Sequence, residues 1–225
     1  MPLYPLHYQR YAYDMADIRV ALIIDIVGSR QLTDRPAAQR AIHEAFETAS
    51  RDVDAIEPLW ATVGDEFQAV FATVRDALRV TTLMRLAFPD AIDCRFGLGA
   101  GEVRRLDGGR GGPIYDGSAW YHARGALDEV DQRGRAAPGL RTWFHSDDAD
   151  ETALVTSHLI LRDHLIEGMS GRERRLAAGA LRGEPQHRLA DSEGITQSAV
   201  SQNLRRSGAA ALIAAQRALG EEAGA

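Results

Sequence analysis

The chain contains no lysine, and all 26 of its basic residues are arginine. Chemistry that needs a lysine amine, such as a Schiff base, is therefore excluded. The single cysteine, Cys94, cannot form an internal disulfide. Because it lies in an apolar run, a buried hydrophobic role is favoured over that of a reactive thiol.

Long hydrophobic stretches are also missing, and no segment is apolar enough over the length of a membrane span. The first 17 residues lack the charged-then-apolar layout of a signal peptide. We therefore expect a cytoplasmic protein without membrane contact. Residues 1–17 are rich in tyrosine and form an expected N-terminal arm, unless translation starts at Met15.

The net charge of -6 excludes a global basic field that would draw the whole molecule to nucleic acid, so any DNA contact needs a local patch. The 45% hydrophobic and 26% charged residues are typical of a globular protein. A length of 225 residues suits one medium domain plus a small one, or a single large domain.

An aspartate interrupts the first apolar segment, residues 18–27, which reads as a buried central strand. Asp25 within it is costly unless it is paired or binds a metal. Gly28, Ser29 and Arg30 then break the strand, and a helix capped by Asp34 is predicted to about residue 53. This arrangement predicts free backbone N–H groups at the turn, which suit a phosphate.

A second acidic feature is the turn at residues 63–66, between strand-like runs 59–63 and 67–71. Asp65 and Glu66 project from this hairpin, and paired carboxylates suit a hard cation such as Mg²⁺. The alternative is an ordinary polar hairpin tip. Glu66 is either a third ligand or solvent-facing.

Strands and helices alternate through about residue 144, which predicts an α+β sandwich. Further helices are predicted at 73–86 and 118–130, strands within 91–103 and at 141–144, and a loop at 104–113. From residue 147 the composition changes, and we expect an all-helical part with helices at 151–166, 170–181 and 212–219.

Three segments, residues 25–29, 61–71 and 95–101, together resemble the motifs of class III nucleotidyl cyclases, whose palm-like fold is shared with diguanylate cyclases. Their order and spacing agree over roughly residues 18–130. The resemblance implies a cyclase/palm-like (ferredoxin-like) domain over residues 18–146. Because the sites of that family form between two subunits, it also implies a homodimer.

The resemblance further implies that Asp25 and Asp65 bridge metal ions, Mg²⁺ or Mn²⁺. The implied nucleotide-binding residues are Ile26, Val27, Gly28, Ser29, Arg30 and Arg124.

Two departures argue against efficient catalysis. Ala61 stands where active cyclases select the base with a lysine, and Tyr121 stands where they carry an asparagine, which leaves Arg124 one residue early. Losing one transition-state donor typically costs ~10²–10³ in rate. Turnover is therefore not favoured, whereas nucleotide binding through metal and phosphates can survive.

Residues 186–207 have the spacing of a helix-turn-helix, with Ala190, Gly194 and Val200 at the small, turn and apolar positions. Thr196 is the expected N-cap of the recognition helix. The alternative is a helical hairpin used only for packing. The side chains offered to DNA are Gln197, Ser198, Ser201, Gln202, Arg205 and Arg206.

The segments 25–30 and 64–68, together with this C-terminal motif, resemble the SatD family of bacterial proteins. The leading hypothesis is a DNA-binding transcriptional regulator whose cyclase-like domain binds a nucleotide with Mg²⁺ and dimerises, with residues 147–225 as the helix-turn-helix domain. One alternative is a divergent nucleotidyl cyclase, a phosphorus–oxygen lyase, with a DNA-binding tail. Another is a structural dimer module whose acidic pair binds nothing.

Overall fold

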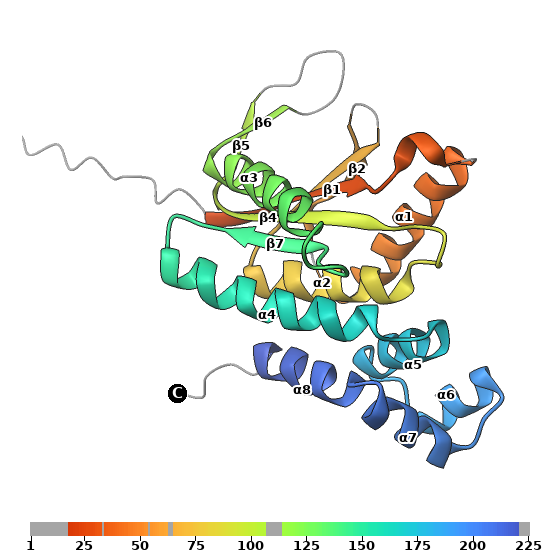
Figure 1. The fold of residues 1–225 in the computed structure, drawn as a ribbon. Coiled ribbons are helices and arrows are strands. Elements are labelled where there is room, and N and C mark those ends of the chain that lie inside the picture. The colour runs from red at the N-terminus through yellow and green to blue at the C-terminus, as the bar shows by residue number, and fades with distance from the viewer. Residues whose placement is uncertain (1–17, 33, 54, 63–64, 107–113, 221–225) are drawn as a thin grey trace, which may run out of the picture.

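The computed structural model describes residues 18–32, 34–53, 55–62, 65–106 and 114–220. The predicted arm, turn residues 63 and 64 and most of the predicted loop lie outside this part. A five-stranded sheet in the order β2-β3-β1-β4-β7 forms the centre of the molecule (Figure 1). Its strands are β1 (Ile18–Ile26), β2 (Ala55–Ala61), β3 (Glu66–Phe71), β4 (Cys94–Glu102) and β7 (Thr142–His145).

The sheet is mixed, because β4 and β7 are parallel while the other neighbouring strands are antiparallel. The α+β class predicted from the sequence is therefore confirmed. Helices cover both faces: α3 (Ser118–Arg133) lies on one, and α1 (Arg35–Ala49) and α2 (Val74–Ala87) lie on the other (Figure 1).

Strand β1 is buried on both faces, as its continuous apolar run predicts. Leu22 and Ile24 belong to the large core with α1 and α2. Ala21 and Ile23 pack against α3. Because side chains alternate along a strand, Asp25 follows Ala21 and Ile23 onto the α3 face.

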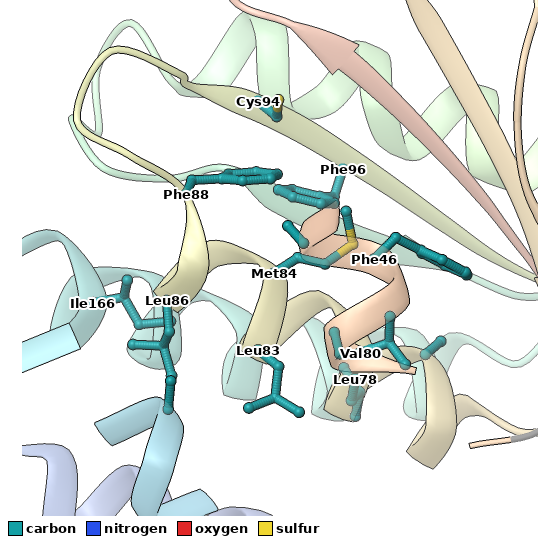
Figure 2. Close-up of a cluster of buried hydrophobic side chains, with 14 of the residues drawn as sticks. Phe46, Leu78, Val80, Leu83, Met84, Leu86, Phe88, Cys94, Phe96 and Ile166 are labelled. Carbon is teal, nitrogen blue, oxygen red and sulfur yellow. The ribbon is translucent and has the colours of Figure 1, made fainter. Parts of the chain in front are cut away.

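The large core fills the space between the sheet and α2, where Figure 2 shows Phe46, Met84 and Phe96 among the buried side chains. Phe88 and Phe96 stack with ring centroids 6.1 Å apart. Cys94 is 1% exposed, and burial raises the pKa of its thiol. The prediction that this cysteine is a buried hydrophobic residue is confirmed.

The structure corrects the predicted end of one helix and the predicted start of one loop. Helix α1 stops at Ala49 and not near residue 53, because Ser50 caps it with backbone and hydroxyl bonds to Phe46 O. Residues 104–106, predicted as loop, form strand β5 (Arg104–Leu106), which pairs with β6 (Ile114–Asp116) in a separate hairpin.

The C-terminal part is helical, as predicted. Its helices are α4 (Ala149–Glu167), α5 (Gly171–Leu181), α6 (Gln186–Glu193), α7 (Gln197–Arg206) and α8 (Ala209–Gly220). Figure 1 shows α2 and α4 between the sheet and α5 to α8. Leu176 of α5 and Val200 of α7 belong to the same core as Ile24. The two predicted parts of the chain therefore share one core.

A buried polar cluster also joins these layers. Arg162 of α4 donates to Asp163 Oδ1 at 2.8 Å, to Thr81 Oγ1 at 3.0 Å and to the Thr142 hydroxyl. These contacts connect α4 with α2 and β7. Arg162 and Asp163 are both completely buried, so the cluster fixes α4 against the sheet part. Among the helices that the structure describes, none is long and apolar enough to cross a membrane.

Candidate functional site

The strand register brings the two predicted acidic segments together. Asp25 of β1 lies directly opposite Glu66 of β3 on one side and Arg95 of β4 on the other. Asp65 immediately precedes Glu66 in the chain. We refer to Asp25, Asp65, Glu66 and Asp131 as the carboxylate cluster.

Arg95 joins two members of this cluster. Its Nη1 lies 3.2 Å from Asp25 Oδ2, and its Nη2 lies 3.0 Å from Asp131 Oδ1 on α3. The side chains of Arg95 and Asp25 are both partly exposed. Arg95 therefore compensates the negative charge of Asp25, while the Asp25 side chain stays accessible to solvent.

Glu66 is held in place by neighbours and is not a freely solvated residue. Arg124 Nη2 of α3 lies 2.6 Å from Glu66 Oε2, and Gln68 Nε2 donates to Glu66 Oε1 at 3.0 Å. The Thr62 hydroxyl donates to the Glu66 carbonyl at 3.2 Å. These contacts disfavour the interpretation that Glu66 simply faces solvent.

The electrostatics of Asp25 reflect its burial and its crowded carboxylate neighbours. Burial raises the pKa of Asp25; Arg95 lowers it, while Asp65, Glu66 and Asp131 raise it further. Arg135 also approaches Asp131, at 3.8 Å. Four carboxylates thus meet three arginines, Arg95, Arg124 and Arg135, which leaves a formal excess of one negative charge.

Within the described ranges, no group of three or more His, Cys, Asp or Glu side chains is arranged to hold a metal ion. The donors still fit Mg²⁺ or Mn²⁺, because such ions commonly take one or two protein carboxylates and complete their shell with water and phosphate oxygens. Asp25 and Asp65 are the residues that would hold the ion.

The turn after β1 only partly matches the predicted phosphate cradle. The Val27 N–H is already used, since it donates to Asp93 O at 2.9 Å, and the Ile26 side chain is buried. Gly28 has φ 66° and precedes a short 3₁₀ helix, η1 (Ser29–Gln31). At the start of such a helix the N–H groups have no partner within it, so Ser29 and Arg30 are the better donors.

Helix α3 places Tyr121 and Arg124 differently. The Tyr121 side chain is exposed and its hydroxyl donates to Asp116 Oδ1 at 3.3 Å, whereas Arg124 reaches Glu66. Arg124 therefore joins the carboxylate cluster, and Tyr121 does not.

Helices α6 and α7 are joined by residues 194–196. Gly194 has φ 64°, which favours glycine, and Ile195 N–H donates to Ala190 O at 3.0 Å. The Thr196 side chain caps α7 by accepting from Ala199 N–H, which confirms the predicted N-cap. Ala190 and Val200 are buried.

The residues predicted to contact DNA lie on the outer side of α7. All are exposed except Ser201, which is partly buried: Gln197, Ser198, Ser201, Gln202, Arg205 and Arg206. By contrast, Arg175 of α5 is bound to Glu193 of α6 at 2.6 Å, and Arg172 lies 3.4 Å from the same carboxylate. Those two arginines therefore form ion pairs between α5 and α6.

Sequence reasoning did not assign roles to Arg95 and Asp131. Arg95 lies inside a recognised motif, and the two-residue period of β4 puts it on the α3 face. Asp131 gives no such signal, because only the packing of α3 on the sheet brings it to Arg95.

Comparison with solved structures finds partial overlaps. The guanylate cyclase domain from Catenaria anguillulae in complex with GTP is 20% identical, with a TM-score of 0.36 over 48% of this chain and 71% of that one. A bacterial light-regulated adenylyl cyclase is 15% identical, with a TM-score of 0.37 over 56% and 74%.

A regulator of polyketide synthase expression from Bifidobacterium adolescentis is 17% identical and covers 91% of this chain and 85% of its own, with a TM-score of 0.28. No curated protein matches the chain. The sequence pattern of the SatD family, however, matches residues 19–219, and the chain belongs to the SatD family.

Proposed function

We propose that this protein is a DNA-binding transcriptional regulator whose sheet part binds a nucleotide together with a divalent cation. The observation that carries the proposal is the register that sets Asp25 opposite Glu66, with Asp65 next in the chain. Carboxylates crowded at one place on a half-buried surface favour a cation, and a bound cation attracts phosphates.

In this proposal Asp25 and Asp65 hold Mg²⁺ or Mn²⁺, which would neutralise phosphate charge. The backbone N–H groups of Ser29 and Arg30 face the phosphates. Ile26, Val27 and Gly28 set the backbone path of the turn that carries these groups. The Arg124 side chain is 48% exposed, so in this proposal it exchanges Glu66 for a phosphate.

The alternative, a divergent nucleotidyl cyclase, is less well supported. Tyr121 is 72% exposed and bonded to Asp116, so it offers no donor to the carboxylate cluster. Incubation with labelled ATP or GTP and Mn²⁺ separates the two functions. A cyclic product that disappears in Asp25→Ala and Asp65→Ala would establish the enzyme.

Nucleotide binding is tested by calorimetry with ATP and GTP, with and without Mg²⁺. Asp65→Ala is expected to weaken the Mg²⁺-dependent binding at least tenfold, because it removes one of two carboxylate ligands. Asp128→Ala removes an exposed carboxylate from α3 and should leave the affinity unchanged. If neither nucleotide binds, or if Asp65→Ala binds as tightly as the parent, the proposal is wrong, and the structural-module alternative gains support.

DNA binding rests on α7, whose exposed Gln202 and Arg205 can read base edges and whose charge can meet phosphates. A homodimer would present two such helices to half-sites roughly 34 Å apart. In gel-shift assays with a duplex selected from random sequences, we expect binding to weaken with salt and Arg205→Ala to lose roughly 1–3 kcal/mol.

The matched control for this assay is Arg75→Ala, which removes an exposed arginine from α2. Equal affinities for Arg205→Ala and Arg75→Ala would contradict a recognition role for α7. Sedimentation of the parent protein as a monomer at all concentrations would contradict the homodimer.

A further inference from the structure

A cavity of about 210 Å³ shares no lining residue with the carboxylate cluster and lies where the sheet part meets α4 and α5. Three arginines from three separate segments line it: Arg85 at the end of α2, Arg141 before β7 and Arg174 on α5. The remaining wall combines carboxylates with apolar groups. The carboxylates are Asp90, Asp93 and Glu167.

Arg85 is the unusual member of this set. Its side chain is only 7% exposed, and its Nη1 makes no hydrogen bond. That atom lies 2.6 Å from Asp163 Oδ1 but is not aligned to donate to it. A buried N–H group without an aligned acceptor is unfavourable, and Nη1 of Arg85 is such a group.

The nearest carboxylate, Asp163, is already occupied. It accepts from Arg162 Nη2 at 2.8 Å and from the Arg141 backbone N–H at 2.7 Å. Two buried arginines, Arg85 and Arg162, thus share one buried carboxylate, which leaves one positive charge in excess. Glu167 lies 3.9 Å from Arg85 Nη2, but it is 53% exposed and compensates weakly.

The other two arginines can change partners. Arg174 is paired with Asp90, whose side chain is 86% exposed. Arg141 donates to Asp93, which is half-exposed. Ion pairs with exposed carboxylates contribute little stability, so an incoming anion can compete for both arginines.

We propose that this cavity binds a small organic oxyanion, a phosphate ester or a carboxylate, whose acidic group accepts from Arg85 and is flanked by Arg141 and Arg174. Arginine suits such groups because its planar fork donates two parallel hydrogen bonds. The volume is below the roughly 300–1,000 Å³ of sites for drug-sized ligands, which limits the occupant to a small metabolite.

The position of the site gives the ligand a structural consequence. Arg174 belongs to α5, which α6 and α7 follow, whereas Arg85 and Arg141 belong to the sheet part. A bound oxyanion would therefore connect α5 to the sheet part. This inference does not depend on nucleotide binding at the carboxylate cluster.

The test is calorimetry on the full chain with inorganic phosphate, pyrophosphate and succinate, at constant ionic strength and with EDTA present to remove divalent cations. We expect saturable binding of at least one probe, and Arg174→Gln should weaken it at least fivefold. Arg182→Gln is the matched control, because Arg182, the residue that follows α5, also pairs with a carboxylate, Glu184, but does not line the cavity.

A second variant, Arg85→Met, replaces the buried guanidinium by an apolar side chain of similar length and should abolish binding. If that variant does not fold, Arg174→Gln decides alone. The proposal is overturned if none of the three probes binds saturably, or if Arg174→Gln and Arg182→Gln bind as the parent does.

Discussion

Asp25 is a carboxylate in a strand whose other residues from Val20 to Ile26 are buried and apolar. It persists there because it reaches the α3 face, where Arg95 lies 3.2 Å away. The compensation is incomplete, since burial and the neighbouring Asp65 and Glu66 raise its pKa. Such a residue is retained at a cost in stability, which is typical of functional carboxylates.

Replacing Asp25 by asparagine should therefore stabilise the protein at neutral pH, by about 1 kcal/mol or less. The folded state raises the pKa above its ordinary value of 3.8, so Asp25 contributes stability below pH 3.8 that is lost as the pH rises through the folded pKa. The asparagine cannot ionise and its amide oxygen can still accept from Arg95. Urea unfolding of parent and variant from pH 3.5 to 7 measures this difference.

Asp128→Asn, an exposed residue of α3, serves as the control and should leave the pH dependence unchanged. A lower stability of Asp25→Asn at pH 7 would mean that its ion pair outweighs its burial.

At the scale of elements, the packing of α3 on β4 builds the carboxylate cluster, because α3 supplies Arg124 and Asp131. Two glycines of β4 permit this contact. A Cβ on Gly99 would lie 2.2 Å from Ala119 O, and one on Gly97 would lie 2.2 Å from Ala123 O. The helix backbone occupies the space that side chains would fill.

Gly99→Ala should push α3 away from the sheet and cost about 1–3 kcal/mol or more, because the methyl group meets backbone and not a movable side chain. The same displacement should weaken the binding of any ligand that contacts Arg124. Thermal unfolding followed by circular dichroism measures the first effect. Gly168→Ala is the comparison, since the nearest atom to its Cβ is 3.7 Å away, and a similar loss in both variants would refute the close contact as the cause.

At the scale of the whole molecule, the buried cluster around Asp163 and the shared core bind the helical part to the sheet part. Burial opposes ionisation of Asp163, but Arg162 and Arg85 outweigh it and lower the pKa of the carboxyl. Asp163 therefore stays ionised and stabilises the fold at neutral pH, and this contribution is lost only as the pH falls through its lowered pKa.

Asp163→Ala leaves two buried arginines without their carboxylate and is expected to cost about 3–5 kcal/mol. Because Arg162 contacts α2 and β7, both parts of the chain should lose stability together, in one transition. Fluorescence of the tryptophans and far-ultraviolet dichroism during urea unfolding check this expectation. Glu167→Ala removes an exposed carboxylate from the same helix and should cost much less; two separate transitions in Asp163→Ala would show that the parts fold independently.

Local signals in the sequence account for the elements. The apolar run of β1, the Thr196 cap and the left-handed Gly194 each act through neighbouring residues, so their consequences can be predicted without tertiary contacts. The predicted end of α1 lay too far along the chain. The helix ends where Ser50 bonds to Phe46 O, and the sequence alone does not single out this residue as the cap.

The sequence by itself determined the α+β class, the two acidic segments and the helical C-terminal part, because hydrophobic periodicity and turn residues are local properties. Only the tertiary structure decided that Arg95 joins Asp25 to Asp131, that Arg124 binds Glu66, and that three arginines surround one cavity. Those contacts bring together residues far apart in the chain, and register and packing alone set their distances.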